Sequence, residues 1–413
     1  MSPLEPATGT GARARRHLDA LAELEAPLAY VDLDAFDANG ATLLREAGHH
    51  QIRVATKSVR CDALIDRALD SDARFHGAMA FTVDEALHLS ARGITDVLIG
   101  YPASEPAALR RLAEWLADHP DQQIRPMVDG PAQLDLLGEA GRAAGTEIAC
   151  CIDVDAGWRP AGSHGPTIGP KRSSLHTPEQ VLEVVRHARR TEGVRVDALM
   201  AYDGQIAGVG DDPPGRPVRA RAIRLMQGRS LADLRERVPR IVAAVQAELA
   251  SEGGLAIVNV GGTGSLSRIA GLVPATELTA GSGFYAPTLF DAYRHLQLQP
   301  AAFFVLPVVR RPARRVATLL GGGYIASGAA GPDRVPQAVF PEGLRLDGDE
   351  GAGEVQTPVL GEAAEGLGIG ARVVLRHAKA GELCERFDRL HLVGGGELRG
   401  DALTYRGAGH TFL

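Results

Sequence analysis

Short apolar runs alternate with longer amphipathic stretches from residue 28 onward, and this alternation predicts repeated strand–helix units. The helical stretches carry apolar residues at three- and four-residue spacing, as in 105–119, 131–145 and 178–190. The strand candidates are "LAYVDL", "IRVAT", "HGAMAF", "DVLIGY", "IRPMVD", "IACCIDVD", "VDALMAY" and "LAIVNVGG". Eight strands, each followed by a helix, predict a closed (β/α)₈ barrel in which "LAYVDL" is the first strand.

The pattern changes after about residue 295, where valine-rich runs such as "FFVLPVVRRPARRVATLLGGGYIASG" are short and interrupted by Gly and Pro. Such spacing is typical of an all-β domain. We therefore expect an α/β protein with three parts. These are an N-terminal tail and helix at 1–25 that packs on the β domain, a barrel at 26–295, and a C-terminal all-β domain at 296–413.

Composition narrows the class of protein. The chain has 413 residues, of which 45% are hydrophobic and 23% charged, values that are ordinary for a folded globular protein. A net charge of -7 gives no sign of the basic face that binds phosphate backbones, so nucleic acid is not an expected partner. The first residues contain no apolar stretch, and the four cysteines fit no zinc-ribbon spacing. We expect a cytoplasmic protein with reduced thiols and no membrane anchor.

Barrel active sites lie at the carboxyl ends of the strands, which directs attention to the residues that follow each apolar run. Lys57 ends the second strand in "IRVATKSVR", although its position alone also fits a solvated lysine. Arg159 follows the sixth strand in "CIDVDAGWRPAG". Its guanidinium would suit an anion or a phenolate, and a structural salt bridge explains it nearly as well.

Two glycine-rich turns follow late in the barrel, "NVGGTGSLSRIAG" and "ELTAGSGFY". Their backbone N–H groups and hydroxyls suit a phosphate group, and late turns are the usual phosphate site of this fold. A lysine, an arginine and a phosphate-binding turn at three strand ends together fit pyridoxal 5'-phosphate, which needs an amine, a cation near its ring oxygen and phosphate donors. The combination therefore predicts a site for this cofactor.

The segments "PLAYVDLDAFDAN", "IRVATKSVR", "DVDAGWRPAG", "ALMAYDGQ" and "GGTGS" resemble, in this order, the barrel of fold-type III pyridoxal phosphate enzymes, the alanine racemase-like class. Within it the chain is most similar to the D-threonine aldolase and D-serine dehydratase group. The resemblance implies that Lys57 forms the Schiff base and that Arg159 lies near the phenolic oxygen. It implies further cofactor contacts from Tyr202, Thr263, Gly264, Ser265, Thr279, Gly281 and Ser282.

Two departures from the family pattern concern the ring nitrogen and a metal. Thr279 stands where alanine racemases carry an arginine to the ring nitrogen, which weakens a racemase interpretation. The aldolase and dehydratase group binds a divalent cation through a histidine and a second ligand two residues later. His377 fits the histidine, but Lys379 occupies the second place, so Cys384 or Glu382 would have to supply the ligand. A zinc or manganese ion at His377 and Cys384 is therefore one hypothesis, and a hydrogen-bonded histidine beside a buried cysteine is the other.

Two further residues are candidates for contact with substrate. Gln205 stands where the group commonly has a histidine, and Tyr324 either reaches an active site or is a core tyrosine. The resemblance implies a pyridoxal phosphate-dependent lyase that acts on small D-β-hydroxy amino acids, by retro-aldol cleavage or by dehydration, in a homodimer. An amino-acid racemase or epimerase and a non-catalytic pyridoxal phosphate-binding protein are the alternatives.

Overall fold

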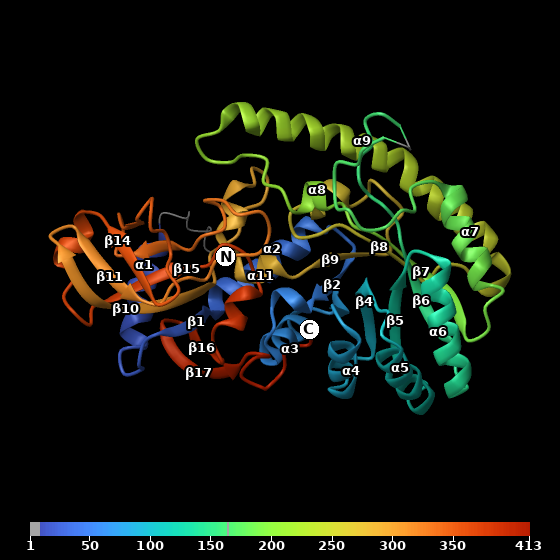
Figure 1. The fold of residues 1–413 in the computed structure, drawn as a ribbon, viewed down its shortest axis with the longest axis horizontal. Helices are drawn as coiled ribbons and strands as arrows, with labels where there is room; N and C mark the ends of the chain where they lie inside the picture. Colours follow the sequence, from blue (N-terminus) through green and yellow to red (C-terminus); the bar gives the residue numbers. More distant parts are fainter. Residues whose placement is uncertain (1–8, 163–164) are drawn as a thin grey trace. The chain divides into compact units, whose positions relative to one another are not determined.

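The computed structural model describes residues 9–162 and 165–413, so the start of the expected N-terminal tail lies outside the described residues. The chain forms two compact units (Figure 1). The sheet unit contains the chain up to Thr42, Ser58–Arg67 and Ser282–Thr411. The barrel unit contains Leu43–Lys57, Ala68–Gly281 and Phe412–Leu413. Each unit thus combines separate stretches of chain, whereas the limits expected from the sequence assumed continuous domains.

A closed parallel barrel of eight strands forms the core of the barrel unit, which confirms the predicted fold class. Its strands are almost entirely buried, because helices cover their outer faces and side chains fill the interior. The strands are β2 (Gln51–Ala55), β3 (Phe75–Ala80), β4 (Asp96–Pro102), β5 (Gln123–Val128), β6 (Ile148–Asp153), β7 (Val194–Ala201), β8 (Ile257–Val260) and β9 (Glu277–Ala280).

Helices follow most of these strands, and the three helical stretches named from the sequence are present as α5, α6 and α7. The longest helix, α9, contains 32 residues. The helices of this unit are α4 (Val83–Ala91), α5 (Pro106–Asp118), α6 (Pro131–Ala144), α7 (Pro178–Ala188), α8 (Gly204–Ala207), α9 (Pro217–Glu248) and α10 (Leu266–Ile269). Two more, α2 (Leu33–Glu46) and α3 (Asp62–Ser71), contain residues of both units.

The expected first barrel strand belongs to the other unit, and this part of the prediction is wrong. β1 (Leu28–Asp32) pairs with β10 and β16 of the sheet unit. All five of its residues are buried, and an apolar run of this kind looks the same in a barrel and in the centre of another sheet. The eighth barrel strand is instead β9, a four-residue strand that the sequence suggested only as part of a glycine-rich turn.

The sheet unit holds a nine-stranded, mostly antiparallel sheet, which confirms the predicted all-β domain. Its central path runs in the order β13-β14-β11-β10-β1-β16-β17. The strands after β1 are β10 (Ala302–Ala313), β11 (Val316–Leu320), β12 (Gln337–Phe340), β13 (Arg345–Leu346), β14 (Gln356–Leu360), β15 (Arg372–Arg376), β16 (Arg389–Gly394) and β17 (Glu397–Leu403). The helices α1 (Thr10–Ala20) and α11 (Ser282–Tyr285) complete the unit, and Ala14 of α1 packs in a cluster with Leu28 and Phe303.

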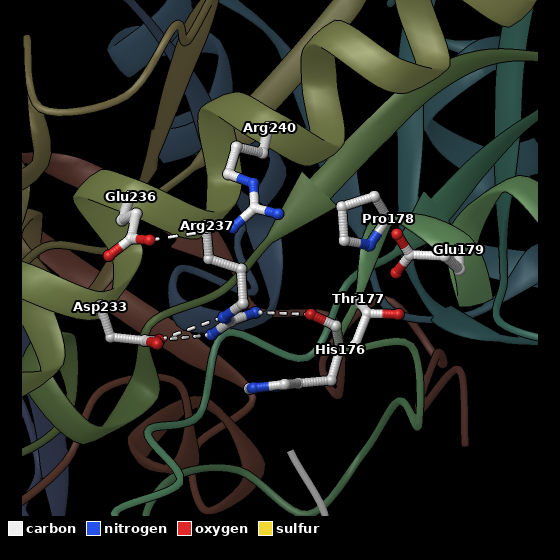
Figure 2. Close-up of a pocket in the computed structure, with 8 residues that line it drawn as sticks. All are labelled: His176, Thr177, Pro178, Glu179, Asp233, Glu236, Arg237 and Arg240. Carbon is white, nitrogen blue, oxygen red and sulfur yellow. Dashed lines mark hydrogen bonds and ion pairs between the residues drawn. The ribbon is translucent and has the colours of Figure 1, made fainter. Parts of the chain in front are cut away.

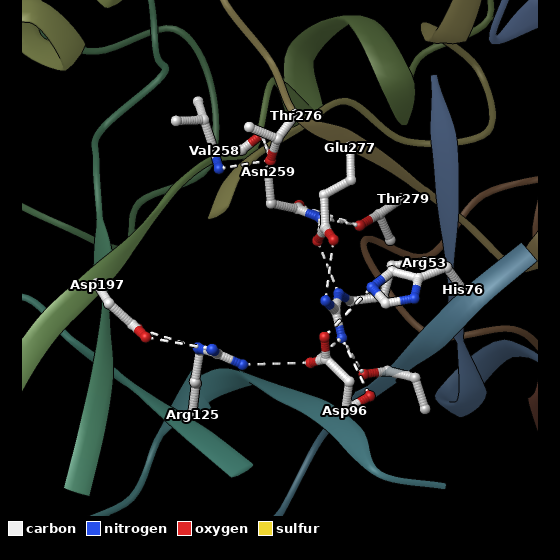
Figure 3. Close-up of polar contacts among 11 residues, drawn as sticks. Arg53, His76, Asp96, Arg125, Asp197, Val258, Asn259, Thr276, Glu277 and Thr279 are labelled. Atoms are coloured by element: carbon white, nitrogen blue, oxygen red, sulfur yellow. Dashed lines mark hydrogen bonds and ion pairs between the residues drawn. The ribbon is translucent and has the colours of Figure 1, made fainter. Parts of the chain in front are cut away.

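The interior of the barrel is layered, with charges below apolar side chains. Arg53 is fully buried and donates two hydrogen bonds to Glu277 at 2.7 and 2.9 Å and one to the carboxylate of Asp96 at 2.9 Å (Figure 3). Arg125 donates to both carboxylate oxygens of Asp197 at 2.9 and 3.1 Å. The apolar layer consists of Met79, Leu98, Met127, Cys151, Ala198, Met200 and Ile257. Because these two layers fill the barrel, a ligand has room only near the carboxyl ends of the strands.

None of the helices in the described part of the chain is both long enough and apolar enough to cross a membrane.

Candidate active site at the carboxyl ends of the barrel strands

Lys57 lies in a 3₁₀ turn, Thr56–Ser58, directly after β2. It is half-buried, and its Nζ is 5.4 Å from the centre of the Tyr101 ring at the end of β4. Burial would raise the pKa of Tyr101, but the charges of Lys57 and Arg172, and their hydrogen bonds to the phenol, lower it overall. Lys57 is therefore part of a polar cluster at the strand ends, which favours a functional role over a solvated lysine.

Arg172 is a member of this cluster that sequence reasoning missed. Its Cζ lies 5.4 Å from the ring centre of Tyr101 and 5.0 Å from that of Tyr202, so the guanidinium contacts both rings. The search of strand ends could have found Tyr101, because "DVLIGY" ends with it. Arg172 lies in the long connection between β6 and α7, where no periodic pattern indicates which side chain contacts the strand ends.

Arg159 lies half-buried after β6, and its guanidinium binds a carboxylate of the same loop. Its Nη2 and Nε are 2.7 and 3.2 Å from Oδ2 of Asp155, whose other oxygen accepts the N–H of Gly157 at 2.8 Å. The His176 ring lies 3.2 Å from the same Oδ2. Burial would raise the pKa of Asp155, but these three partners lower it overall. The salt-bridge interpretation of Arg159 is therefore the one that its contacts support, and contact with a phenolic oxygen stays a proposal.

A surface pocket of about 270 Å³ lies beside this loop, next to α7 and α9 (Figure 2). Arg237 crosses it, donating to the backbone oxygen of Asp155 at 2.8 Å and to the carboxylate of Asp233 at 2.7 Å. The pocket is lined by His176, Thr177, Pro178, Glu179, Asp233, Glu236, Arg237 and Arg240. Its central cation thus anchors the loop that carries Arg159, and we assign the pocket a supporting role.

The first glycine-rich turn is buried from Gly261 to Ser265, and its conformation needs glycine. Gly261 has a φ of +78°, and a Cβ at Gly262 would lie 3.1 Å from the Tyr202 ring. Ser265 donates its hydroxyl proton to Asp203 at 3.1 Å and accepts the N–H of Gly262 at 3.2 Å. The hydroxyl of Ser265 therefore shapes the turn.

The second turn meets the first in the barrel unit. The N–H of Gly281 donates to Oγ1 of Thr263 at 3.4 Å, so the ends of β8 and β9 are joined. Gly264 is buried in the first turn, and Ser282 begins α11. Two adjoining glycine turns at neighbouring strand ends fit the requirements of a phosphate group, because glycine lets the backbone approach a bound anion closely.

Thr279 and Gln205 are both buried and hydrogen-bonded. Oγ1 of Thr279 lies 2.8 and 3.0 Å from the amide nitrogen and oxygen of Asn259, which also donates to Glu277 at 2.7 Å (Figure 3). Gln205 donates to the backbone oxygen of Ala156 at 2.8 Å and to Ser230 at 2.6 Å. The Gln205 amide thus supports the loop after β6, and its contact with substrate stays a prediction.

Tyr324 lies in an aromatic cluster of the sheet unit. Its ring centre is 5.0 Å from that of Phe304 and 5.5 Å from that of Phe387. Burial raises its pKa. These contacts fit the alternative of a core tyrosine, and a role with substrate stays a prediction.

The two residues expected to bind a metal are both buried, and a metal at them stays a prediction. His377 is 3% exposed, and burial, reinforced by the charge of Arg376, lowers its pKa to about 3. Cys384 donates its thiol to the backbone oxygen of Val59 at 3.2 Å, and burial raises the pKa of that thiol. Lys379 instead donates to Ser327 at 3.0 Å. No group of three or more His, Cys, Asp or Glu side chains within residues 9–162 and 165–413 could hold a metal ion.

The geometry defines a (β/α)₈ barrel protein with a lysine at the end of one strand and glycine-rich turns at the ends of two others. The chain belongs to the alanine racemase N-terminal domain family, which matches residues 31–246. This confirms the resemblance drawn from the sequence. The fold of this family implies pyridoxal 5'-phosphate as the cofactor.

Individual proteins of known activity share only a small fraction of identical residues with this chain. The chain is 26% identical over 189 residues to 3-hydroxy-D-aspartate aldolase from Paracoccus denitrificans, and the match covers 46% of the chain and 45% of that relative. The chain thus matches less than half the length of this curated relative.

Two solved structures show the same fold over nearly the whole chain. D-threonine aldolase from Filomicrobium marinum aligns with a TM-score of 0.75 at 22% identity and covers 94% of this chain and 96% of that one. D-threo-3-hydroxyaspartate dehydratase from Delftia sp. HT23 aligns with a TM-score of 0.72 at 19% identity, covering 93% and 98%.

Proposed function

We propose that this protein is a pyridoxal phosphate-dependent lyase that acts on small D-β-hydroxy amino acids. The observation that carries the proposal is Lys57, held beside Tyr101 at the same end of the barrel as the two glycine turns. Family membership supports the cofactor, and the names of the similar proteins support the substrate class. Aldol cleavage and dehydration are both represented among those names.

Different residues of the barrel unit would bind the cofactor and transfer protons. When bound, the cofactor supplies an aldehyde for Lys57 and a conjugated ring that accepts electrons from the substrate Cα. The backbone of the turn at Gly261–Ser265 would hold the phosphate, and the contact between Thr263 and Gly281 keeps the two turns together. Thr279, fixed by Asn259, would offer the cofactor a neutral hydroxyl. The amine of Lys57 would bind the aldehyde and, when free, would take up and return a proton.

A metal at His377 and Cys384 stays a proposal. Burial lowers the pKa of His377 to about 3, so its ring is neutral, which is the form that binds a metal. Burial raises the pKa of the Cys384 thiol, which would have to lose its proton to become a ligand. If the site holds a metal, a chelator should lower the lyase rate and zinc or manganese should restore it, and a rate unchanged by the chelator would contradict the metal site.

The proposal is tested by incubating the purified, cofactor-loaded protein with D-threonine and with D-threo-3-hydroxyaspartate. Glycine plus an aldehyde, or an oxo acid plus ammonia, supports it. Formation of the enantiomer alone would indicate a racemase, and no reaction with any hydroxy amino acid would indicate a binding protein.

Lys57→Ala is expected to lose the absorbance of the lysine-bound cofactor and at least 10³-fold in rate, on the order of the effect of removing a covalent catalyst. Lys57→Arg is the matched control, because it keeps the positive charge beside Tyr101 without a reactive amine. Both variants should fail, since the amine itself is required. Full activity in either one would refute the assignment.

We further propose a cytoplasmic location and a homodimer, in keeping with the resemblance to the aldolase and dehydratase group. Sedimentation at several protein concentrations tests the oligomeric state.

A further inference from the structure

One buried carboxyl group of the barrel is not explained by any pairing. Asp153 is the last residue of β6 and is 6% exposed. Among the residues that the structure describes, its carboxylate makes no hydrogen bond or ion pair, and only more distant charges act on it. Neither carboxylate oxygen is among the fully buried polar atoms without a partner, so the carboxylate keeps access to solvent and is not tied up by a neighbouring side chain. The neighbouring Asp155 shows the contrast, because Arg159, His176 and Gly157 all bind it.

The side chain of Asp153 points into the barrel at its carboxyl end. In the parallel pairing of β6 with β7, Asp153 lies beside Met200 and Cys151 lies beside Ala198. Met200, Cys151 and Ala198 all belong to the apolar layer inside the barrel. Because side chains alternate along a strand, Asp153 continues the inward row of Cys151 one step above that layer.

Lys57 lies on the opposite wall. The barrel order is β2-β3-β4-β5-β6-β7-β8-β9, so β6 is four strands from β2 in either direction around the closed sheet. Lys57 follows β2, and Asp153 ends β6. An amine and a carboxyl group thus occupy facing sides of the same end of the barrel, where the ligand has room.

The surroundings of Asp153 suit proton transfer. Burial raises its pKa to about 7, the charge of Arg172 opposes this rise, and Asp129 and Asp155 add to it. A carboxyl group that titrates near neutrality can both take up and release a proton. The other candidates are less suited, because the Gln205 amide is not basic and the His176 ring is held by Asp155.

We propose that Asp153 is the catalytic base that removes the proton from the β-hydroxyl of the substrate. This inference rests on the proposed lyase function and selects the aldol course within it. The assignment also supplies a base in a chain that has Gln205 where the group commonly has a histidine.

The step balances in atoms and electrons. The Asp153 carboxylate takes the hydroxyl proton, and the O–H electron pair becomes the second C–O bond of the product aldehyde. The Cα–Cβ bond breaks, and its electron pair stays with the Cα fragment. That fragment takes up one proton and leaves as glycine, and Asp153 gives its proton to water to regenerate the carboxylate.

The sign of the pH dependence follows from this role. The base is active when deprotonated, so kcat/KM for D-threonine should rise with pH through about 7 and level off above it. Asp129→Asn removes a negative charge that raises the pKa of Asp153, so this limb of the profile should move to lower pH. A rate that falls as the pH rises through 7 would show an acid, as a dehydratase requires, and would overturn the proposal.

The main test uses Asp153→Asn, which keeps the shape of the side chain and cannot accept the proton. We expect cleavage of D-threonine to fall about 10²- to 10⁴-fold, the usual contribution of a general base, and the limb near pH 7 to disappear. The absorbance of the bound cofactor and its change on adding D-threonine should match the wild type. Asp129→Asn is the control, and its rate above pH 8 should stay within about threefold of wild type.

Two further measurements test whether Asp153 acts on the β-hydroxyl, acts at Cα or has only a structural role. Exchange of the Cα hydrogen of D-alanine in D₂O, followed by NMR, involves no hydroxyl, so Asp153→Asn should exchange at the wild-type rate. Equal loss of exchange and cleavage would place Asp153 at Cα and overturn the proposal. Thermal stability of Asp153→Asn should equal or exceed wild type, because an unpartnered buried charge is removed. A clear fall in the unfolding temperature would show a structural role instead.

The failure of this inference is distinct from failure of the proposed function. If the wild type does not act on any hydroxy amino acid, the function is wrong. If the wild type cleaves D-threonine and Asp153→Asn cleaves it equally well, only the role of Asp153 is wrong.

Discussion

Arg53 lies in the middle of a strand with an apolar sequence. Among the residues that the structure describes, its side chain is nevertheless the largest that is fully buried. Its charge is compensated by Glu277 and Asp96, which come from strands far away in the sequence. Asp96 in turn binds Arg125 and His76. Burial would raise the pKa of Asp96, but the hydrogen bond from His76 and the charges of Arg53 and Arg125 hold it well below its usual range.

Removal of Asp96 should therefore destabilise the barrel. We expect Asp96→Asn to lower the free energy of unfolding at pH 7.5 by about 2–4 kcal/mol. The reason is that the buried guanidinium groups of Arg53 and Arg125 both lose a negatively charged partner. A carboxyl group with a lowered folded-state pKa stabilises above its unfolded pKa and loses this contribution as the pH falls. The difference between wild type and variant should thus shrink progressively below about pH 4.

Urea unfolding at pH 7.5 and at pH 3.5 measures both effects. Asp84→Asn is the matched control, since the Asp84–Arg111 pair is 56% and 48% exposed and such pairs contribute less than about 1 kcal/mol. An Asp96→Asn variant as stable as this control would mean that the charged layer does not support the barrel.

At the level of single residues, the sequence identified the polar residues at the strand ends but not the contacts that these residues make. Lys57 could be found because it follows a strand, and the turns at Gly261 and Gly281 because glycine is rare at such density. Arg172 and the pairing of Arg53 with Glu277 could not be found, because contacts between distant segments leave no local pattern. Asp153 lies at a strand end, where an active site is expected, but its lack of partners is visible only in three dimensions.

At the level of elements, the contact between β2 and β9 positions the candidate active site. β9 pairs with β2 in parallel, so the end of β9 lies beside the strand that leads to Lys57. A Cβ at Gly281 would lie 2.3 Å from the backbone oxygen of Ala55, the last residue of β2. Only glycine lets the two strand ends approach this closely.

Gly281→Ala should separate these strand ends. We expect a loss of about 1–3 kcal/mol in the free energy of unfolding and weaker binding of the cofactor, measured by urea unfolding and by a fluorescence titration. The control is Gly228→Ala in α9, where a Cβ has open space and alanine should stabilise the helix by about 0.5–1 kcal/mol. Wild-type stability and cofactor affinity in Gly281→Ala would mean that the approach of β9 to β2 is not needed.

The same pair of elements shows which strands the hydrophobic pattern could identify. The strands from β2 to β8 were identified because each is a short apolar run before a helix. β9 was missed because it has only four residues, and two of them, Glu277 and Thr279, are polar side chains that face the interior. β1 was found but assigned to the wrong sheet, since complete burial looks the same in both.

At the level of the whole molecule, the fold class followed from the sequence, but the course of the chain through the two units did not. β1 lies between β10 and β16 in the sheet, although about 270 residues of chain separate it from β10. Leu28 pairs with Val305 on one side, and Tyr30 pairs with His391 on the other. β1 therefore joins the strands from β13 to β10 to the pair β16 and β17, which do not pair with each other directly along this path.

A fragment of residues 296–413 should therefore fail to fold, although the change in sequence pattern marks it as a domain. Without β1, the backbone groups of β10 and β16 that it pairs with lose their partners, and the apolar cluster loses Leu28 and Tyr30. We expect poor dispersion in the amide NMR spectrum and no cooperative thermal unfolding by circular dichroism.

The matched control joins residues 9–42 to this fragment through a flexible linker, which restores β1 and α1. This version should recover dispersed amide signals and a cooperative transition, because the central strand is again available to both of its neighbours. If 296–413 alone folds cooperatively, β1 is an accessory strand and the sheet is stable without it. If the joined version also fails, the sheet needs more of the chain than its own strands, and Ser58–Arg67 and 282–295, the remaining stretches of the sheet unit, would be the next segments to add.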